Sequence, residues 1–122
     1  MTNTEEQIIA VDLDGTIIDF SWATYAGVTT FGLVDEAFVE QLRQYHGAGW
    51  KIIIHTCRLT PRIYEAEGLS EARMLDILTR FLRERHIPFH NIWTGVGKPV
   101  ARLYIDDRSM RPDEFKQRSP RL

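Results

Sequence analysis

Short apolar runs alternate with amphipathic segments along most of this 122-residue chain. The apolar runs predict strands at about residues 7–12, 50–55, 89–93 and 101–105. Apolar side chains at helical spacing predict helices at about 36–46 and 71–85, with Asp35 and Ser70 as N-caps. Strands separated by helices favour right-handed crossovers and a parallel sheet. We therefore expect an α/β fold, a three-layer α/β/α sandwich around a parallel Rossmann-like sheet.

Composition narrows the class of protein without changing this picture. A hydrophobic fraction of 43% and a charged fraction of 26% are those of a globular protein, and the length suits one domain over 1–122. We expect its core at about 7–107 and a loosely ordered tail at 108–122. No apolar run approaches the roughly 20 residues that span a bilayer, so no membrane partner is expected. The single Cys57 and the absence of a basic leader favour a cytoplasmic protein.

The charges are unevenly spread, although the net charge is only −2. Residues 1–42 contain eight acidic residues and no Lys or Arg. One interpretation is a solvated acidic face. The other is that basic residues farther along the chain, among them Arg58 and Lys98, balance acids at a shared site and receive an anionic substrate.

Two predicted strands end in pairs of carboxylates. Asp12 and Asp14 follow the first strand, and Asp106 and Asp107 follow the last. If the second and fourth strands flank the first, these acids meet at the carboxyl edge of the sheet, where open α/β folds keep their sites. Like charges about 4 Å apart repel by about 4 kcal/mol at an effective dielectric of 20, so a divalent cation is the natural complement. Carboxylate oxygens without a Cys or His cluster point to Mg2+.

Four short segments carry a resemblance to a known family. They are Asp12-Leu13-Asp14-Gly15-Thr16, Ile52-Ile53-Ile54-His55-Thr56, Lys98 and Ile105-Asp106-Asp107. In this order, at strand ends, they resemble the four motifs of the haloacid dehalogenase superfamily. The resemblance covers about residues 7–107 and implies a phosphatase-type member, because position 14 is an Asp.

The resemblance also implies a role for each of these residues. Asp12 would be the nucleophile that forms an aspartyl-phosphate, and Asp14 the general acid and base. Thr56 and Lys98 would complete the catalytic group. Gly15, Thr16, Thr56, Cys57 and Arg58 would line the phosphate or substrate site. Mg2+ would be held by Asp12, Asp106, Asp107 and the backbone carbonyl of Asp14.

The spacing of the motifs leaves no room for the cap domain that many superfamily members insert. We expect an open site with only a flap at about 17–34, whose Trp22, Tyr25 and Phe31 either pack as local core or meet the substrate. An open site suits a phosphorylated small molecule or a phosphorylated macromolecular end. It could also be shielded by a second copy of the chain.

Three alternatives remain from the sequence. Thr56-Cys57-Arg58 resembles a motif of polynucleotide 3′-phosphatases, with Arg58 gripping a phosphate, although the chain lacks the strongly basic surface typical of nucleic-acid binding. A receiver domain would also carry a phosphorylated Asp, but its acidic pair and its Lys come in a different order. A binding module of the same fold would accept phosphate without hydrolysing it.

Overall fold

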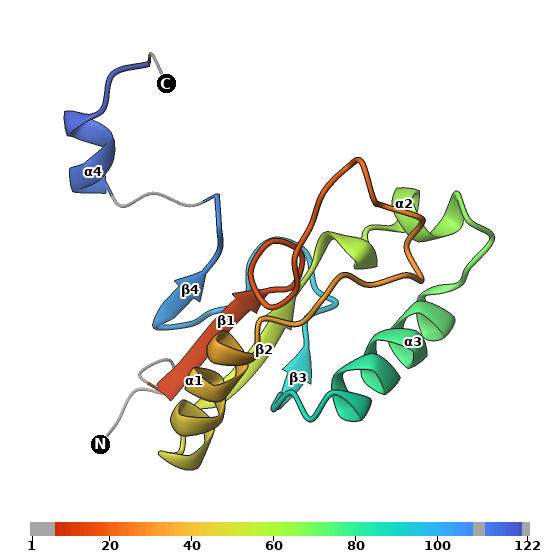
Figure 1. Cartoon of the computed structure of the whole chain (residues 1–122), viewed down its shortest axis with the longest axis horizontal. Coiled ribbons are helices and arrows are strands. Elements are labelled where there is room, and N and C mark those ends of the chain that lie inside the picture. The colour runs from red at the N-terminus through yellow and green to blue at the C-terminus, as the bar shows by residue number, and fades with distance from the viewer. Residues whose placement is uncertain (1–6, 109–111, 121–122) are drawn as a thin grey trace.

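A four-stranded parallel sheet forms the centre of the computed structural model, which describes residues 7–108 and 112–120. The strand order is β3-β2-β1-β4, with bounds β1 Ile8–Asp12, β2 Lys51–His55, β3 Asn91–Ile92 and β4 Leu103–Ile105. Helices α1 (Glu36–Gly47) and α3 (Glu71–Glu84) flank the sheet, and Figure 1 shows α1 in front of β1 and β2. The predicted α/β fold with an all-parallel sheet is therefore confirmed.

The N-cap residues place the starts of both long helices as predicted, α1 at Glu36 and α3 at Glu71. The Asp35 carboxylate accepts a hydrogen bond from the Phe38 N–H at 3.1 Å, and the Ser70 hydroxyl accepts one from the Arg73 N–H at 3.1 Å. These bonds satisfy backbone donors that a helix leaves unpaired at its start. Three short helices were not predicted: the 3-10 turn η2 (Cys57–Leu59), α2 (Pro61–Glu65) and α4 (Pro112–Gln117). Residues 109–111 and 121–122 of the expected loose tail lie outside the described residues.

One face of the sheet carries the hydrophobic core. Alternate residues of the two central strands, Ile9 and Val11 of β1 and Ile52 and Ile54 of β2, pair in register and are buried. Helices α1 and α3 cover this face with Val39, Leu42, Met74, Leu78, Phe81 and Leu82. Full burial of one such side chain stabilises the fold by about 1.5–3 kcal/mol relative to exposure. The core therefore fixes β1 and β2, the two strands from which the first two motifs extend.

The opposite face is partly covered by the connection between β3 and β4, and Tyr104 on this face stays 42% exposed. Ala10, Ile53 and Tyr104 belong to this face because side chains alternate along a strand. The Tyr104 hydroxyl donates a hydrogen bond to the Pro99 carbonyl at 2.5 Å, and Pro99 is fully buried. A loop, in place of the usual helix, thus lies against this side of the sheet.

The strand order sets the place of the site. β2 lies on one side of β1 and β4 lies on the other, so the carboxyl ends of three strands converge at the switch point of the sheet. After β1 the chain forms a flap (residues 17–34), whose ends are tied by hydrogen bonds from Asp19 N–H to Leu33 O at 2.9 Å and from Asp35 N–H to Ile17 O at 2.8 Å. Among the described residues, no helix has the length and apolar character to cross a bilayer.

Candidate active site

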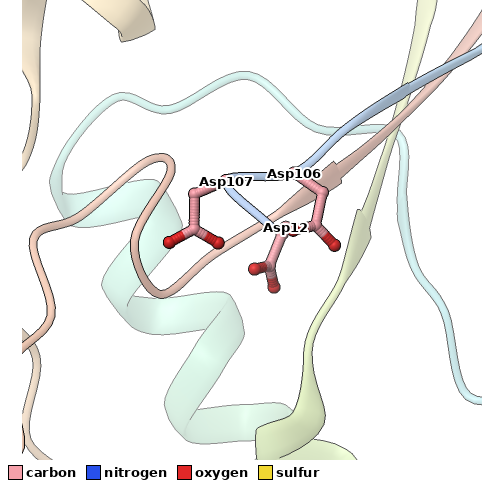
Figure 2. A group of neighbouring side chains, drawn as sticks. All are labelled: Asp12, Asp106 and Asp107. Carbon is pink, nitrogen blue, oxygen red and sulfur yellow. The ribbon is translucent and has the colours of Figure 1, made fainter. Parts of the chain in front are cut away.

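Three carboxylates gather at the carboxyl ends of β1 and β4. Asp12 ends β1, and Asp106 and Asp107 follow β4 directly. One oxygen from each lies within 4.8 Å of the other two, and Figure 2 shows the three side chains around a shared space. The Asp106 carboxylate also accepts a hydrogen bond from the Arg108 N–H at 2.7 Å, which orients it. We refer to Asp12, Asp106 and Asp107 as the acidic cluster.

Gly15 makes room for the acidic cluster. Its backbone has φ +82°, a left-handed conformation that favours glycine, and its N–H donates to the Ile18 carbonyl at 2.8 Å. A Cβ at this position would overlap the Asp107 carboxylate. The Gly-Thr turn after β1 therefore serves packing as well as chain reversal.

Burial and mutual repulsion act on Asp12. The pKa of Asp12 is raised from 3.8 to about 6, first because the carboxyl is partly removed from water and then because Asp106, Asp14 and Asp107 add negative charge. A hydrogen bond with the Leu13 backbone lowers the pKa and only partly offsets these effects. The donor set fits a hard divalent cation, since it offers three carboxylate oxygens within reach of one ion.

Asp14 is held by a bidentate ion pair with Arg58. The Arg58 Nε donates to one Asp14 oxygen at 2.9 Å, and Nη2 donates to the other at 2.7 Å. Nη1 donates to the carbonyls of Val28 and Thr30, both at 2.7 Å. Four of the five guanidinium N–H groups are thus used inside the chain, and Arg58 is only 3% exposed.

The same Arg58 joins the flap to the domain. Its guanidinium lies 4.5 Å from the ring centroid of Phe31, and Phe31 stacks on Phe81 of α3 with centroids 4.1 Å apart. The sequence predicted Arg58 as a phosphate ligand. In the structure its guanidinium donates to the Asp14 carboxylate and to the carbonyls of Val28 and Thr30, and Arg58 also lines the cavity, so the phosphate-binding role stays a prediction.

Thr56 begins the turn that follows β2. Its hydroxyl oxygen accepts a hydrogen bond from the Arg58 N–H at 3.1 Å, which leaves the hydroxyl proton free to donate. The next residue, Cys57, has a raised pKa because it is partly buried and lies near Asp14 and Asp12. Its thiol therefore stays protonated near neutral pH and is a poor nucleophile.

Lys98 and Thr16 stand apart from the cavity. The Lys98 ammonium lies 5.2 Å from the ring centroid of Tyr104. The pKa of His55 is lowered chiefly by burial and secondly by the positive charge of Lys98. The Thr16 hydroxyl is buried and has no hydrogen-bond partner among the described residues. The structure thus brings neither side chain into contact with the acidic cluster.

The acidic cluster opens into a cavity of about 680 Å³. Five of the residues to which the sequence assigned site roles, Asp12, Asp14, Thr56, Cys57 and Arg58, line it, and their roles stay predictions. Sequence reasoning missed Trp93 and Arg108 as lining residues. Their positions in the sequence could have indicated this, since Trp93 directly follows β3 and Arg108 directly follows Asp106-Asp107. Phe20, Trp22 and Tyr25 of the flap line the cavity as well.

Two solved structures are similar to this chain. A protein from Vibrio cholerae, whose crystal structure was determined as an MCSG target, is 33% identical, over 93% of this chain and 90% of that one, with a TM-score of 0.56. A conserved protein from Bacteroides thetaiotaomicron is 24% identical, over 84% of this chain and 76% of that one, with a TM-score of 0.58. No family model and no curated protein matches the chain.

The identity and coverage of the first match show that this chain belongs to the same family as the Vibrio cholerae protein. The second match supports the fold alone.

Proposed function

We propose that this protein is a metal-dependent phosphomonoesterase of the haloacid dehalogenase type, with Asp12 as its nucleophile. The observation that carries the proposal is the acidic cluster, which lies at the ends of β1 and β4 and lines a cavity of about 680 Å³. Three of the four motifs support the same assignment, since they lie at the carboxyl ends of β1, β2 and β4, whereas Lys98 lies in the loop before β4 and away from the cavity.

In the proposed reaction an Asp12 oxygen attacks phosphorus and the ester P–O bond breaks, which leaves an aspartyl-phosphate. Water then attacks the phosphorus, frees inorganic phosphate and restores the Asp12 carboxylate. The nucleophile must be ionised, and with a pKa of about 6 Asp12 is mostly so at neutral pH. Mg2+ held by the acidic cluster would supply positive charge against the carboxylates and the incoming phosphate.

Asp14 is the proposed general acid and base. Both of its oxygens accept hydrogen bonds from Arg58, which fixes the direction of the carboxylate that takes a proton from the attacking water in the proposed mechanism. In the acid step the leaving oxygen must take a proton from Asp14, so one of the two Arg58 bonds has to give way to that proton. The free proton of the Thr56 hydroxyl would donate to a phosphoryl oxygen.

Turnover of p-nitrophenyl phosphate with Mg2+ tests this proposal. Asp12→Asn should remove essentially all turnover, because an amide cannot act as the nucleophile. Glu40→Gln, at an exposed position of α1, is the matched control and should keep wild-type activity. Rapid acid quench and intact-mass analysis should detect a phosphoryl group on the wild type and none on Asp12→Asn. A folded Asp12→Asn protein that keeps more than a few per cent of the wild-type activity would refute the covalent mechanism.

Two alternatives from the sequence are weighed here, one by the contacts of Arg58 and the other by the same assay. The polynucleotide 3′-phosphatase hypothesis requires Arg58 to bind a phosphate. Its Nε and Nη2 donate to Asp14 instead, which argues against that hypothesis. A phosphoacceptor module would form phospho-Asp12 without steady turnover, so a burst followed by no further product would identify it.

As to location, the single Cys57 remains the reason to propose a cytoplasmic protein.

A further inference from the structure

Three aromatic side chains of the flap form a group at the cavity. Phe20 and Trp22 lie edge to face with ring centroids 4.9 Å apart, and Tyr25 lies 5.8 Å from Phe20 and 5.6 Å from Trp22. All three line the cavity that contains Asp12. We call Phe20, Trp22 and Tyr25 the aromatic group.

The flap contains both buried and exposed apolar side chains. Val28 is fully buried and Phe31 stacks on Phe81, so these two side chains anchor the inner part of the flap to the core, while Thr29 and Thr30 between them are exposed. Trp22 is 76% exposed. Burying an aromatic side chain removes about 150–250 Å² of surface from water, which is favourable, and the exposed Trp22 indole lies at the cavity that contains the acidic cluster. The flap thus has an anchored inner part and an outer part that offers flat apolar surface to the cavity.

A fourth flat ring comes from a different segment. Trp93 follows β3, lines the same cavity and donates its indole N–H to the Gly97 carbonyl at 2.8 Å. Gly95 lies so close to this ring that a Cβ there would overlap it. The Trp93 ring is therefore fixed in place before any ligand arrives.

A cation also lines the cavity. Arg108 follows the acidic cluster, and no carboxylate among the described residues forms an ion pair with its guanidinium. The cavity thus combines flat rings, a guanidinium and the acidic cluster. Rings and cations bind a nucleobase and a phosphate, respectively.

We propose that the substrate is a phosphomonoester with a flat ring close to its phosphate, a nucleoside monophosphate, whose base stacks on the aromatic group while its phosphate reaches Asp12. This inference rests on the proposed phosphatase function. A long nucleic acid is not favoured, because the net charge is −2 and residues 1–42 contain no Lys or Arg to follow a phosphate backbone.

Two substrates that differ only in the ring test the proposal. Adenosine 5′-monophosphate and ribose 5-phosphate present the same phosphate on the same sugar carbon. With Mg2+, kcat/KM should be about tenfold or more higher for the nucleotide, the effect expected of one base–aromatic stack. Trp22→Ala should bring the ratio close to one. Because Trp22 is largely exposed, this variant should keep the wild-type melting temperature.

Trp50→Phe is the matched control. Trp50 precedes β2 at the amino edge of the sheet, contacts Tyr45 with ring centroids 5.5 Å apart and is absent from the cavity lining, so its variant should keep the wild-type ratio. A wild-type ratio near one would overturn ring recognition while leaving the phosphatase proposal intact. A further arm uses an oligonucleotide with a 3′-phosphate, and a preference for it over adenosine 3′-monophosphate of tenfold or more would overturn the choice of a mononucleotide.

If the protein is not a phosphatase, neither adenosine 5′-monophosphate nor ribose 5-phosphate will be hydrolysed, a result distinct from equal hydrolysis of both. In that case calorimetric titration of the same protein with the same two compounds decides the ring proposal. Binding of adenosine 5′-monophosphate at least tenfold tighter than ribose 5-phosphate, and lost in Trp22→Ala, would support it. Equal affinities would overturn it.

Discussion

Asp12→Asn should make the metal-free protein more stable while it abolishes turnover. In the absence of a divalent cation Asp12 is partly buried and repelled by Asp106, Asp14 and Asp107. Replacing the carboxylate with an amide removes that repulsion and keeps the shape of the side chain. A residue retained for structure alone would be expected to show the opposite effect on stability.

The pKa of Asp12 sets the size and the pH range of this effect. The folded-state pKa of about 6 exceeds the ordinary value of 3.8, so the native state binds the proton more tightly than the unfolded state. Ionised Asp12 therefore destabilises the fold fully above pH 6, and the penalty disappears below about pH 4. A tenfold change in proton affinity is worth about 1.4 kcal/mol, which gives at most about 3 kcal/mol. Because the group is partly solvated, we expect about 1–2 kcal/mol.

Denaturant unfolding in EDTA between pH 4 and pH 8 measures this difference. Asp12→Asn should exceed the wild type by about 1–2 kcal/mol at pH 8, and the two curves should converge near pH 4. Glu40→Gln, which removes a carboxylate from an exposed pair with Arg43, should change stability by no more than about 1 kcal/mol. If Asp12→Asn is no more stable than the wild type at pH 8, the electrostatic account of the acidic cluster is wrong.

Further predictions concern the metal, the acid–base group and its positioning residue. Mg2+ at a hundredfold excess over its Kd should raise the free energy of unfolding by about 2.7 kcal/mol, and Asp106→Asn should reduce this gain; a wild-type melting temperature indifferent to Mg2+ would refute the metal site. Asp14→Asn should slow steady-state turnover about 10²-fold or more, and wild-type turnover in this variant would remove Asp14 as the acid and base. Arg58→Lys should destabilise the fold by about 2–3 kcal/mol, since one ammonium cannot replace four N–H donors of Arg58. A double-mutant cycle of Arg58→Lys with Asp14→Asn, measured by denaturant unfolding, should show coupling above about 0.5 kcal/mol, and strict additivity would contradict the pairing.

The elements that local sequence signals specify were predicted well. Asp35 and Ser70 cap their helices through bonds to residues three positions away, so a short stretch of sequence contains the whole signal. The apolar runs along 7–12 and 50–55 predicted the two central strands. Because parallel strands present their carboxyl ends at one edge, the approach of Asp12 to Asp106 also followed from sequence order once the topology was assumed.

The shorter elements depended on more than local pattern. β3 covers only Asn91–Ile92 and β4 only Leu103–Ile105, shorter than their apolar runs indicated. Ladder hydrogen bonds define a strand, and Phe89 and Ala101 lie just outside the registered pairs. Apolar character alone does not reveal where pairing stops.

Only the tertiary structure decided what Arg58 and the flap do. Arg58 pairs with Asp14 across 44 positions and with the carbonyls of Val28 and Thr30 across 30 and 28 positions, partners that no local pattern identifies. The sequence left open whether the flap packs or meets a ligand, and the structure divides it, with Phe31 against α3 and Trp22 at the cavity. The physical reason is that strands and caps follow from interactions between near neighbours, whereas the partner of a buried charge depends on which distant segments the fold brings into contact.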